Sequence, residues 1–147
     1  MSTGPENVDR QFTSAAVVCA ADASYLDAEN FAPHRVSKFY YMVDSVDIVR
    51  AANEAFGGLH MEIDGVIRHH VGWEDWQITT VLNNQKDMDK VKKAIQCHES
   101  QLTGYGPIGE MSVSELTKLF GTGYFYRTFS LVNGGRKVET DLFEGLR

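Results

Sequence analysis

Apolar positions along the chain fall into helical periods that alternate with short apolar runs. Residues 11–22 are apolar almost all round, which is typical of a buried helix. Another helix is expected to begin after Ser45, a capping residue, and to end at Gly57-Gly58. Apolar residues recur at spacings of three, four and seven over residues 87–101, which predicts an amphipathic helix.

The runs between these helices are short and rich in β-formers, so we expect strands there. The predicted strands are 38–43, 59–63, 66–70, 78–82 and 125–132. Asp64-Gly65 separates two of them and is a strong hairpin signal. Ser112 and Glu115 form a capping-box pattern that predicts a short helix over residues 112–120. Strands that alternate with helices indicate a mixed α/β class.

Length and composition favour a single globular unit. The 147 residues are 43% hydrophobic and 23% charged, which suits one domain and excludes a disordered or fibrous chain. A compact domain of this size buries about 68–70% of its unfolded surface. Residues 1–10 are polar without an apolar period, so we expect a flexible N-terminus and a single α/β domain over residues 11–147.

Charge and cysteine content limit the cellular compartment and the classes of binding partner that we expect for the chain. The chain has 14 Lys+Arg against 20 Asp+Glu, a net charge of −6, which argues against nucleic-acid binding. No apolar run reaches the roughly 18 residues of a membrane helix, so no membrane partner is expected. Cys19 and Cys97 cannot build a disulfide framework, and the N-terminus does not look like a signal peptide, so we expect a cytoplasmic protein.

The histidines do not form a recognisable metal motif. They are His34, His60, His69, His70 and His98. His69 and His70 would point to opposite faces of a strand, and no His-x-His, His-x-x-x-His or Cys-x-x-Cys spacing occurs. No metal ligands are therefore assigned from the residues.

Two groups of residues remain as candidates for binding a substrate. His98 lies on the apolar stripe of the 87–101 helix, either as a core histidine that holds the next loop or as a cleft residue near a substrate. Trp73 and Trp76 flank Glu74-Asp75, and they could line a sugar-binding cleft or anchor the core. The carboxylate pair could do acid–base chemistry if desolvated, or could lie in solvent.

Nucleophilic catalysis and anion binding have only weak sequence signals. Cys97 is adjacent to His98, but neighbouring residues on a helix lie about 100° apart and do not face each other. The turn at residues 133–136 could hold an anion or could be a simple turn. The residues alone define no complete active site, and the catalytic residues stay unknown.

Four stretches resemble, in order, segments of the PIG-L (LmbE-like) N-acetylglucosaminyl deacetylase family, and they span about residues 11–147. They are Pro33-His34-Arg35-Val36 with Lys38, Tyr40 and Tyr41; Gly72-Trp73 with Asp75-Trp76 and Ile78-Thr79-Thr80; Cys97-His98-x-Ser100-Gln101; and residues 126–136 with 139–146. The resemblance implies a Rossmann-like sheet with flanking helices. It also implies zinc-dependent hydrolysis of an N-acyl amide, typically on an N-acetylglucosamine-type sugar, with zinc polarising the carbonyl and activating water.

The chain departs from this family at the metal site. The family's His-Pro-Asp-Asp-Glu stretch is absent, and residues 5–10 lack the histidines of its His-Pro-Asp-His stretch. Only His98 and Gln101 transfer as motif residues. We therefore expect a truncated or degenerate deacetylase that resembles the C-terminal half of the family and binds no zinc alone. A second copy or a partner could supply the missing half. The alternative is a non-catalytic binding or assembly module that uses Trp73, Trp76 and Tyr105.

Overall fold

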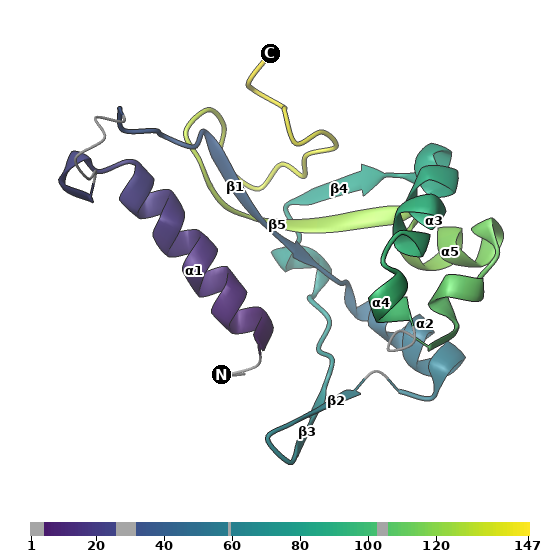
Figure 1. Ribbon diagram of the computed structural model, residues 1–147. Helices are drawn as coiled ribbons and strands as arrows, with labels where there is room; N and C mark the ends of the chain where they lie inside the picture. The colour runs from purple at the N-terminus through teal and green to yellow at the C-terminus, as the bar shows by residue number, and fades with distance from the viewer. Residues whose placement is uncertain (1–4, 26–31, 59, 103–105) are drawn as a thin grey trace.

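The centre of the molecule is a three-stranded antiparallel sheet (Figure 1). The computed structural model describes residues 5–25, 32–58, 60–102 and 106–147. The sheet has the order β1-β5-β4, formed by β1 (Lys38–Val43), β5 (Thr122–Ser130) and β4 (Thr80–Asn83). A separate hairpin consists of β2 (His60–Ile63) and β3 (Val66–His69). The predicted mixed α/β class is confirmed.

The Rossmann-like parallel sheet expected from the resemblance is wrong. β5 pairs antiparallel with both of its neighbours. Between β4 and β5 the chain forms two principal helices, α3 (Met88–Gln96) and α5 (Val113–Phe120), which pack against each other. A single crossover helix returns the chain to the start of a strand and gives parallel pairing. The chain between β4 and β5 contains more than one helix, and β5 runs antiparallel to β4.

Local signals placed several helix and turn boundaries correctly. α2 (Val46–Phe56) begins after Ser45, whose hydroxyl accepts a hydrogen bond from the Ile48 N–H at 3.3 Å. It ends at Gly57, which has a left-handed φ of 76°. α5 has the predicted capping box of Ser112 and Glu115.

The hairpin turn lies where the sequence predicts it, whereas two strands of the sheet begin at other residues than predicted. The hairpin turns at Asp64 and Gly65, whose φ angles are 55° and 74°. β4 begins two residues later than the predicted run, and β5 begins at Thr122 rather than at 125. Thr122 joins the strand because it pairs with Asn83 of β4. Cross-strand pairing therefore set the boundary that propensity did not.

The helix predicted over residues 87–101 is interrupted. α3 ends at Gln96, and α4 (Glu99–Leu102) follows after a break at Cys97 and His98. The N–H groups of Cys97 and His98 donate to carbonyls three residues earlier, at 3.1 and 3.0 Å. Such bonds tighten the last turn of a helix and redirect the chain.

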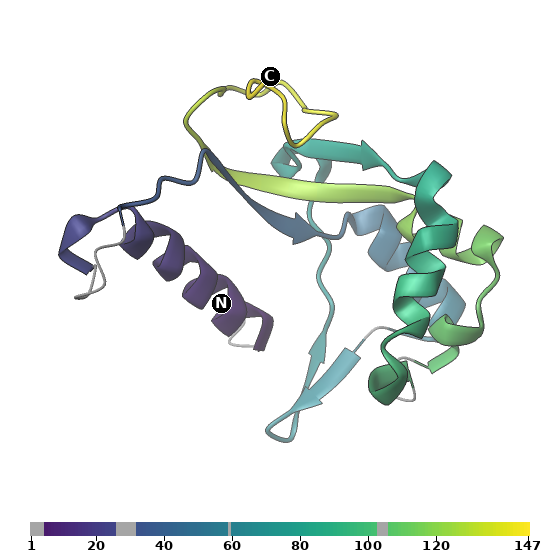
Figure 2. The ribbon, with the colours of Figure 1, turned by 45° about the horizontal axis from the view of Figure 1, so that its top comes forward.

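The N-terminal helix is not the buried helix that its composition predicts. α1 (Pro5–Ala20) begins at Pro5, inside the stretch expected to be a loose terminus. Phe12 is 72% exposed and Val18 67% exposed. The helix lies along β1 on the side away from α2, α3 and α5 (Figure 2). Its contacts with β1 include the Ser14–Tyr41 hydroxyl pair at 2.7 Å and the Arg10 guanidinium above the Tyr41 ring.

The core is small and lies between the sheet and the helices α2, α3 and α5. Its buried apolar side chains are Val43, Val49, Ala52, Ile78, Met88 and Leu116. Four shorter 3₁₀ turns complete the described chain: η1 (Ala23–Tyr25), η2 (Asp75–Gln77), η3 (Gln85–Asp87) and η4 (Gly106–Glu110). No helix in the described ranges combines the length and apolar character that a membrane span requires.

Candidate functional site

The C-terminal segment crosses the outer edge of β4 and brings Glu139 beside Thr80. The Val81 N–H donates to the Glu139 carbonyl at 2.9 Å, and the Glu139 N–H donates to the Thr79 carbonyl at 2.9 Å. The edge of β4 is thereby covered by backbone hydrogen bonds. The Glu139 side chain turns inward and is only 1% exposed.

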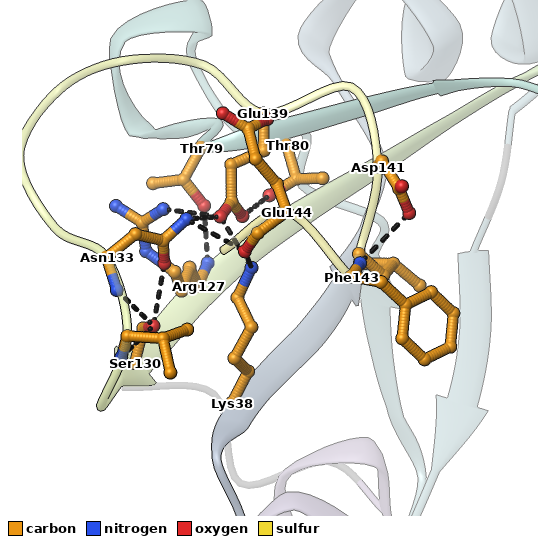
Figure 3. A network of polar contacts seen from close by, with 12 residues as sticks. Lys38, Thr79, Thr80, Arg127, Ser130, Asn133, Glu139, Asp141, Phe143 and Glu144 are labelled. Atoms are coloured by element: carbon orange, nitrogen blue, oxygen red, sulfur yellow. Dashed lines mark hydrogen bonds and ion pairs between the residues drawn. The ribbon is translucent and has the colours of Figure 1, made fainter. Parts of the chain in front are cut away.

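The Glu139 carboxylate is the centre of a buried polar cluster (Figure 3). Lys38 Nζ lies 2.6 Å from Oε1 and Arg127 Nη1 lies 3.0 Å from it, and the Asn133 amide also donates to Oε1. Oε2 accepts from the Tyr40 hydroxyl at 2.7 Å and from the Thr80 hydroxyl at 2.9 Å. Two cations, two hydroxyls and an amide therefore surround one carboxylate.

The electrostatics of this cluster favour the ionised carboxylate. Burial opposes ionisation, but the hydrogen bonds from Lys38, Tyr40, Asn133 and Thr80 outweigh it and lower the pKa of Glu139 to about 2. For Lys38, burial likewise acts against the charge, and the hydrogen bond with Glu139 is part of what raises the lysine pKa. Both groups are charged at neutral pH.

This cluster fastens the C-terminal segment to the sheet and leaves no open position for a substrate or a metal. Both carboxylate oxygens are already engaged, and a catalytic metal site keeps a position free. Sequence reasoning missed Glu139. Two apolar side chains of the same segment, Phe143 and Leu146, are 56% and 43% exposed. The signal that could have found the cluster is the acidic C-terminal segment together with one basic residue in each of two predicted strands, Lys38 and Arg127.

A second feature is a cavity of about 530 Å³ at the C-terminal end of β1. Side chains from α2, α3, α5, η4 and the two strands β1 and β5 form its walls. His98 lines it, at the break between α3 and α4, and is exposed. Of the two positions considered for His98, a buried core or a cleft, the structure gives the cleft.

Trp73 and Trp76, two of the other predicted site residues, do not line this cavity with His98. Trp73 is half-buried and packs on Tyr126, with ring centroids 5.2 Å apart. Its backbone links Asp44 and Val46 through hydrogen bonds of 2.8 and 3.0 Å. Trp76 is 83% exposed. Gln101 lies in α4, and its side chain falls outside the described part of the structure, as does Tyr105.

The remaining candidates for chemistry occupy separate surfaces. Glu74 and Asp75 are exposed, and the Glu74 N–H donates to the Gln77 side chain at 2.9 Å, which makes this pair a solvated turn. Cys97 is exposed and free. His70 Nε2 lies 2.7 Å from Asp44 Oδ2, whereas His69 faces His60 across the hairpin with ring centroids 6.2 Å apart.

The zinc ion that the resemblance implies does not fit the described residues. Within them, no three histidine, cysteine, aspartate or glutamate side chains converge on one point. We therefore assign no chemical step to a metal held by this part of the chain.

Comparison of the chain with protein-family models, with curated protein sequences and with solved structures found no match. The fold and the site define a mixed α/β protein with an antiparallel sheet, a buried polar clamp and an apolar cavity.

Proposed function

We propose that the chain is one part of a PIG-L-type deacetylase, which hydrolyses an N-acyl amide such as an N-acetylglucosamine derivative once a second polypeptide segment supplies zinc and a general base. The four stretches that resemble segments of this family, in the same order along the chain, support the proposed amide hydrolysis. The proposed setting is the cytoplasm, in keeping with the exposed free thiol of Cys97.

One observation carries the requirement for a second segment: the protein exposes too much surface for a self-sufficient domain. Its accessible surface is 10755 Å². A compact monomer of 16.4 kDa would expose about 7,500 Å². The chain therefore buries about 55% of its unfolded surface instead of the expected 68–70%. The excess, about 3,200 Å² on this chain alone, is larger than the roughly 800 Å² that each partner contributes to a standard interface.

The edge of the sheet at β1 is the best place for such a segment to bind. The opposite edge, at β4, is covered by the Glu139 segment, whereas β1 is a terminal strand of the sheet. A segment added at β1 must share this strand with α1, whose Arg10 guanidinium donates to the Met42 carbonyl at 3.3 Å. Met42 on β1 is 74% exposed. An edge strand of this kind can accept a further strand through its backbone N–H and C=O groups.

The proposal is tested by joining the chain to the half that it lacks. Residues 11–147 would be fused after the metal-binding half of a PIG-L-type deacetylase, and acetate release from an N-acetylglucosamine derivative would be measured. We expect zinc-dependent release from the chimera and none from the chain alone. Controls are the metal-binding half by itself and the chimera with the motif aspartates changed to asparagine. A folded, zinc-loaded chimera that releases no acetate would overturn the proposal.

A non-catalytic binding or assembly module is the second candidate. It is favoured by apolar side chains exposed away from the sheet edge, since Val71 is 78% and Trp76 83% exposed. On this hypothesis the chain forms oligomers through that surface, and Trp76→Ala weakens them. Sedimentation equilibrium of both proteins would measure the effect, and monomers in both cases would contradict self-assembly.

A further inference from the structure

The cavity at the end of β1 has the size and the walls of a small-molecule site. Its volume of about 530 Å³ lies within the roughly 300–1,000 Å³ typical of ligand pockets. Most of its lining is apolar and comes from elements far apart in the sequence. Ile48 belongs to α2, Val91 and Ile95 to α3, Ile108 to η4, and Leu119 to α5.

The polar lining residues include two exposed ones, which mark the opening. Asp44 and His98 are both exposed and line the cavity. Asp44 directly follows β1, and its carboxylate is paired with His70 on the hairpin side at 2.7 Å. The chain as a whole carries a net charge of −6. Asp44 is the one carboxylate among the residues that line the cavity, and that lining contains no lysine or arginine, which disfavours an anionic ligand and favours a cationic one.

From these observations we infer that the cavity binds a linear alkylamine, with the aliphatic chain between α3 and α5 and the ammonium group near Asp44. The apolar walls provide the affinity, because the aliphatic chain leaves water. Asp44 provides the preference for a cation. This inference is independent of the proposed deacetylase activity, since it requires neither zinc nor a second polypeptide.

Displacement of the fluorescent probe N-phenyl-1-naphthylamine from the full chain would test the ligand class. Decylamine and decanoate would be compared below their aggregation concentrations. We expect decylamine to bind at least tenfold more tightly than decanoate, and about 15-fold more tightly than octylamine for its two extra methylenes. Equal binding of decylamine and decanoate, or no effect of chain length, would overturn the inference.

Substitutions test the location. Ile95→Trp and Leu119→Trp fill the cavity from α3 and from α5, and each should lower decylamine affinity at least tenfold. Val18→Trp on the exposed face of α1 is the matched control and should change the affinity less than twofold. Asp44→Asn should remove the preference for decylamine over decanoate. Asp47→Asn, at an exposed position of α2, should keep that preference. Unchanged binding in a folded cavity variant would overturn the location, and the wild-type ligand series stands even if one variant does not fold.

Discussion

Glu139 has five side-chain partners, and both of its oxygens are engaged while the carboxylate is out of contact with water. An isolated buried carboxylate would be costly, so the two cations must stay in place for the ion to be tolerated. The same pairing leaves Lys38 and Arg127 dependent on Glu139, since their side chains are 3% and 7% exposed. Removing any one of these three charges should therefore destabilise the whole cluster.

Replacing Glu139 should show how strongly Lys38 and Arg127 depend on its charge. Glu139→Gln leaves two buried cations without a counter-ion, which should lower the free energy of unfolding by about 3–5 kcal/mol. Urea denaturation at neutral pH measures it. The control is Lys90→Gln, which removes the exposed Asp87–Lys90 pair and should leave the urea midpoint nearly unchanged. Similar losses in both variants would contradict a special role for the buried cluster.

The lowered pKa of Glu139 makes the stability of the fold depend on pH. Because its pKa falls from 4.5 to about 2 on folding, the ionised group stabilises the fold fully above about pH 4.5. That contribution, about 3 kcal/mol, is lost as the pH falls from about 4.5 through 2. Urea midpoints at pH 7, 5, 3 and 2 would follow it. Glu139→Gln should lose less stability than the wild type over this range, and parallel curves would rule out Glu139 as the source.

At the scale of elements, the link between the hairpin and the sheet depends on a close backbone approach. A Cβ added at Gly72 would lie 2.5 Å from Val46 Cα and 2.7 Å from Val46 N, at the start of α2. The adjacent Trp73 makes two backbone hydrogen bonds across the same gap. Only glycine leaves room for both chains here.

Gly72→Ala should therefore force the start of α2 away from Trp73 and cost about 1–3 kcal/mol. Gly134→Ala is the matched control, because a Cβ there meets no atom within 4 Å and should leave stability nearly unchanged. Thermal unfolding followed by circular dichroism measures both. Equal melting temperatures for the two variants would show that α2 can move without loss.

At the scale of the whole molecule, α1, the hairpin and the helical group extend from the sheet in different directions (Figure 1). This arrangement explains the large accessible surface, because few elements are covered on both sides. A chain of 147 residues folded compactly has a radius of gyration of about 15 Å.

The open shape predicts a larger radius in solution. Small-angle scattering of the chain, with its mass determined from the same samples, should give a radius of gyration clearly above about 15 Å for a monomer. A monomer at about 15 Å would mean that α1 and the hairpin close onto the sheet. That result would remove the surface excess on which the proposed second segment depends.

The sequence by itself determined the features governed by neighbouring residues. Ser45, Gly57, Asp64-Gly65 and the Ser112–Glu115 box all predicted the boundaries that the structure shows, since caps and turns depend on local hydrogen bonds and φ angles. The stripe on α3 likewise predicted that His98 would face a core or a cleft.

Only the tertiary structure decided how these elements combine. Examples are the antiparallel order β1-β5-β4, the exposure of α1, and the Glu139 cluster, whose residues lie up to 101 positions apart in the sequence. No local period encodes such pairings, because they depend on which surfaces remain uncovered once the helices have formed. The apolar composition of α1 indicated that the helix needs a covering surface, and the described chain covers the helix only in part, along β1.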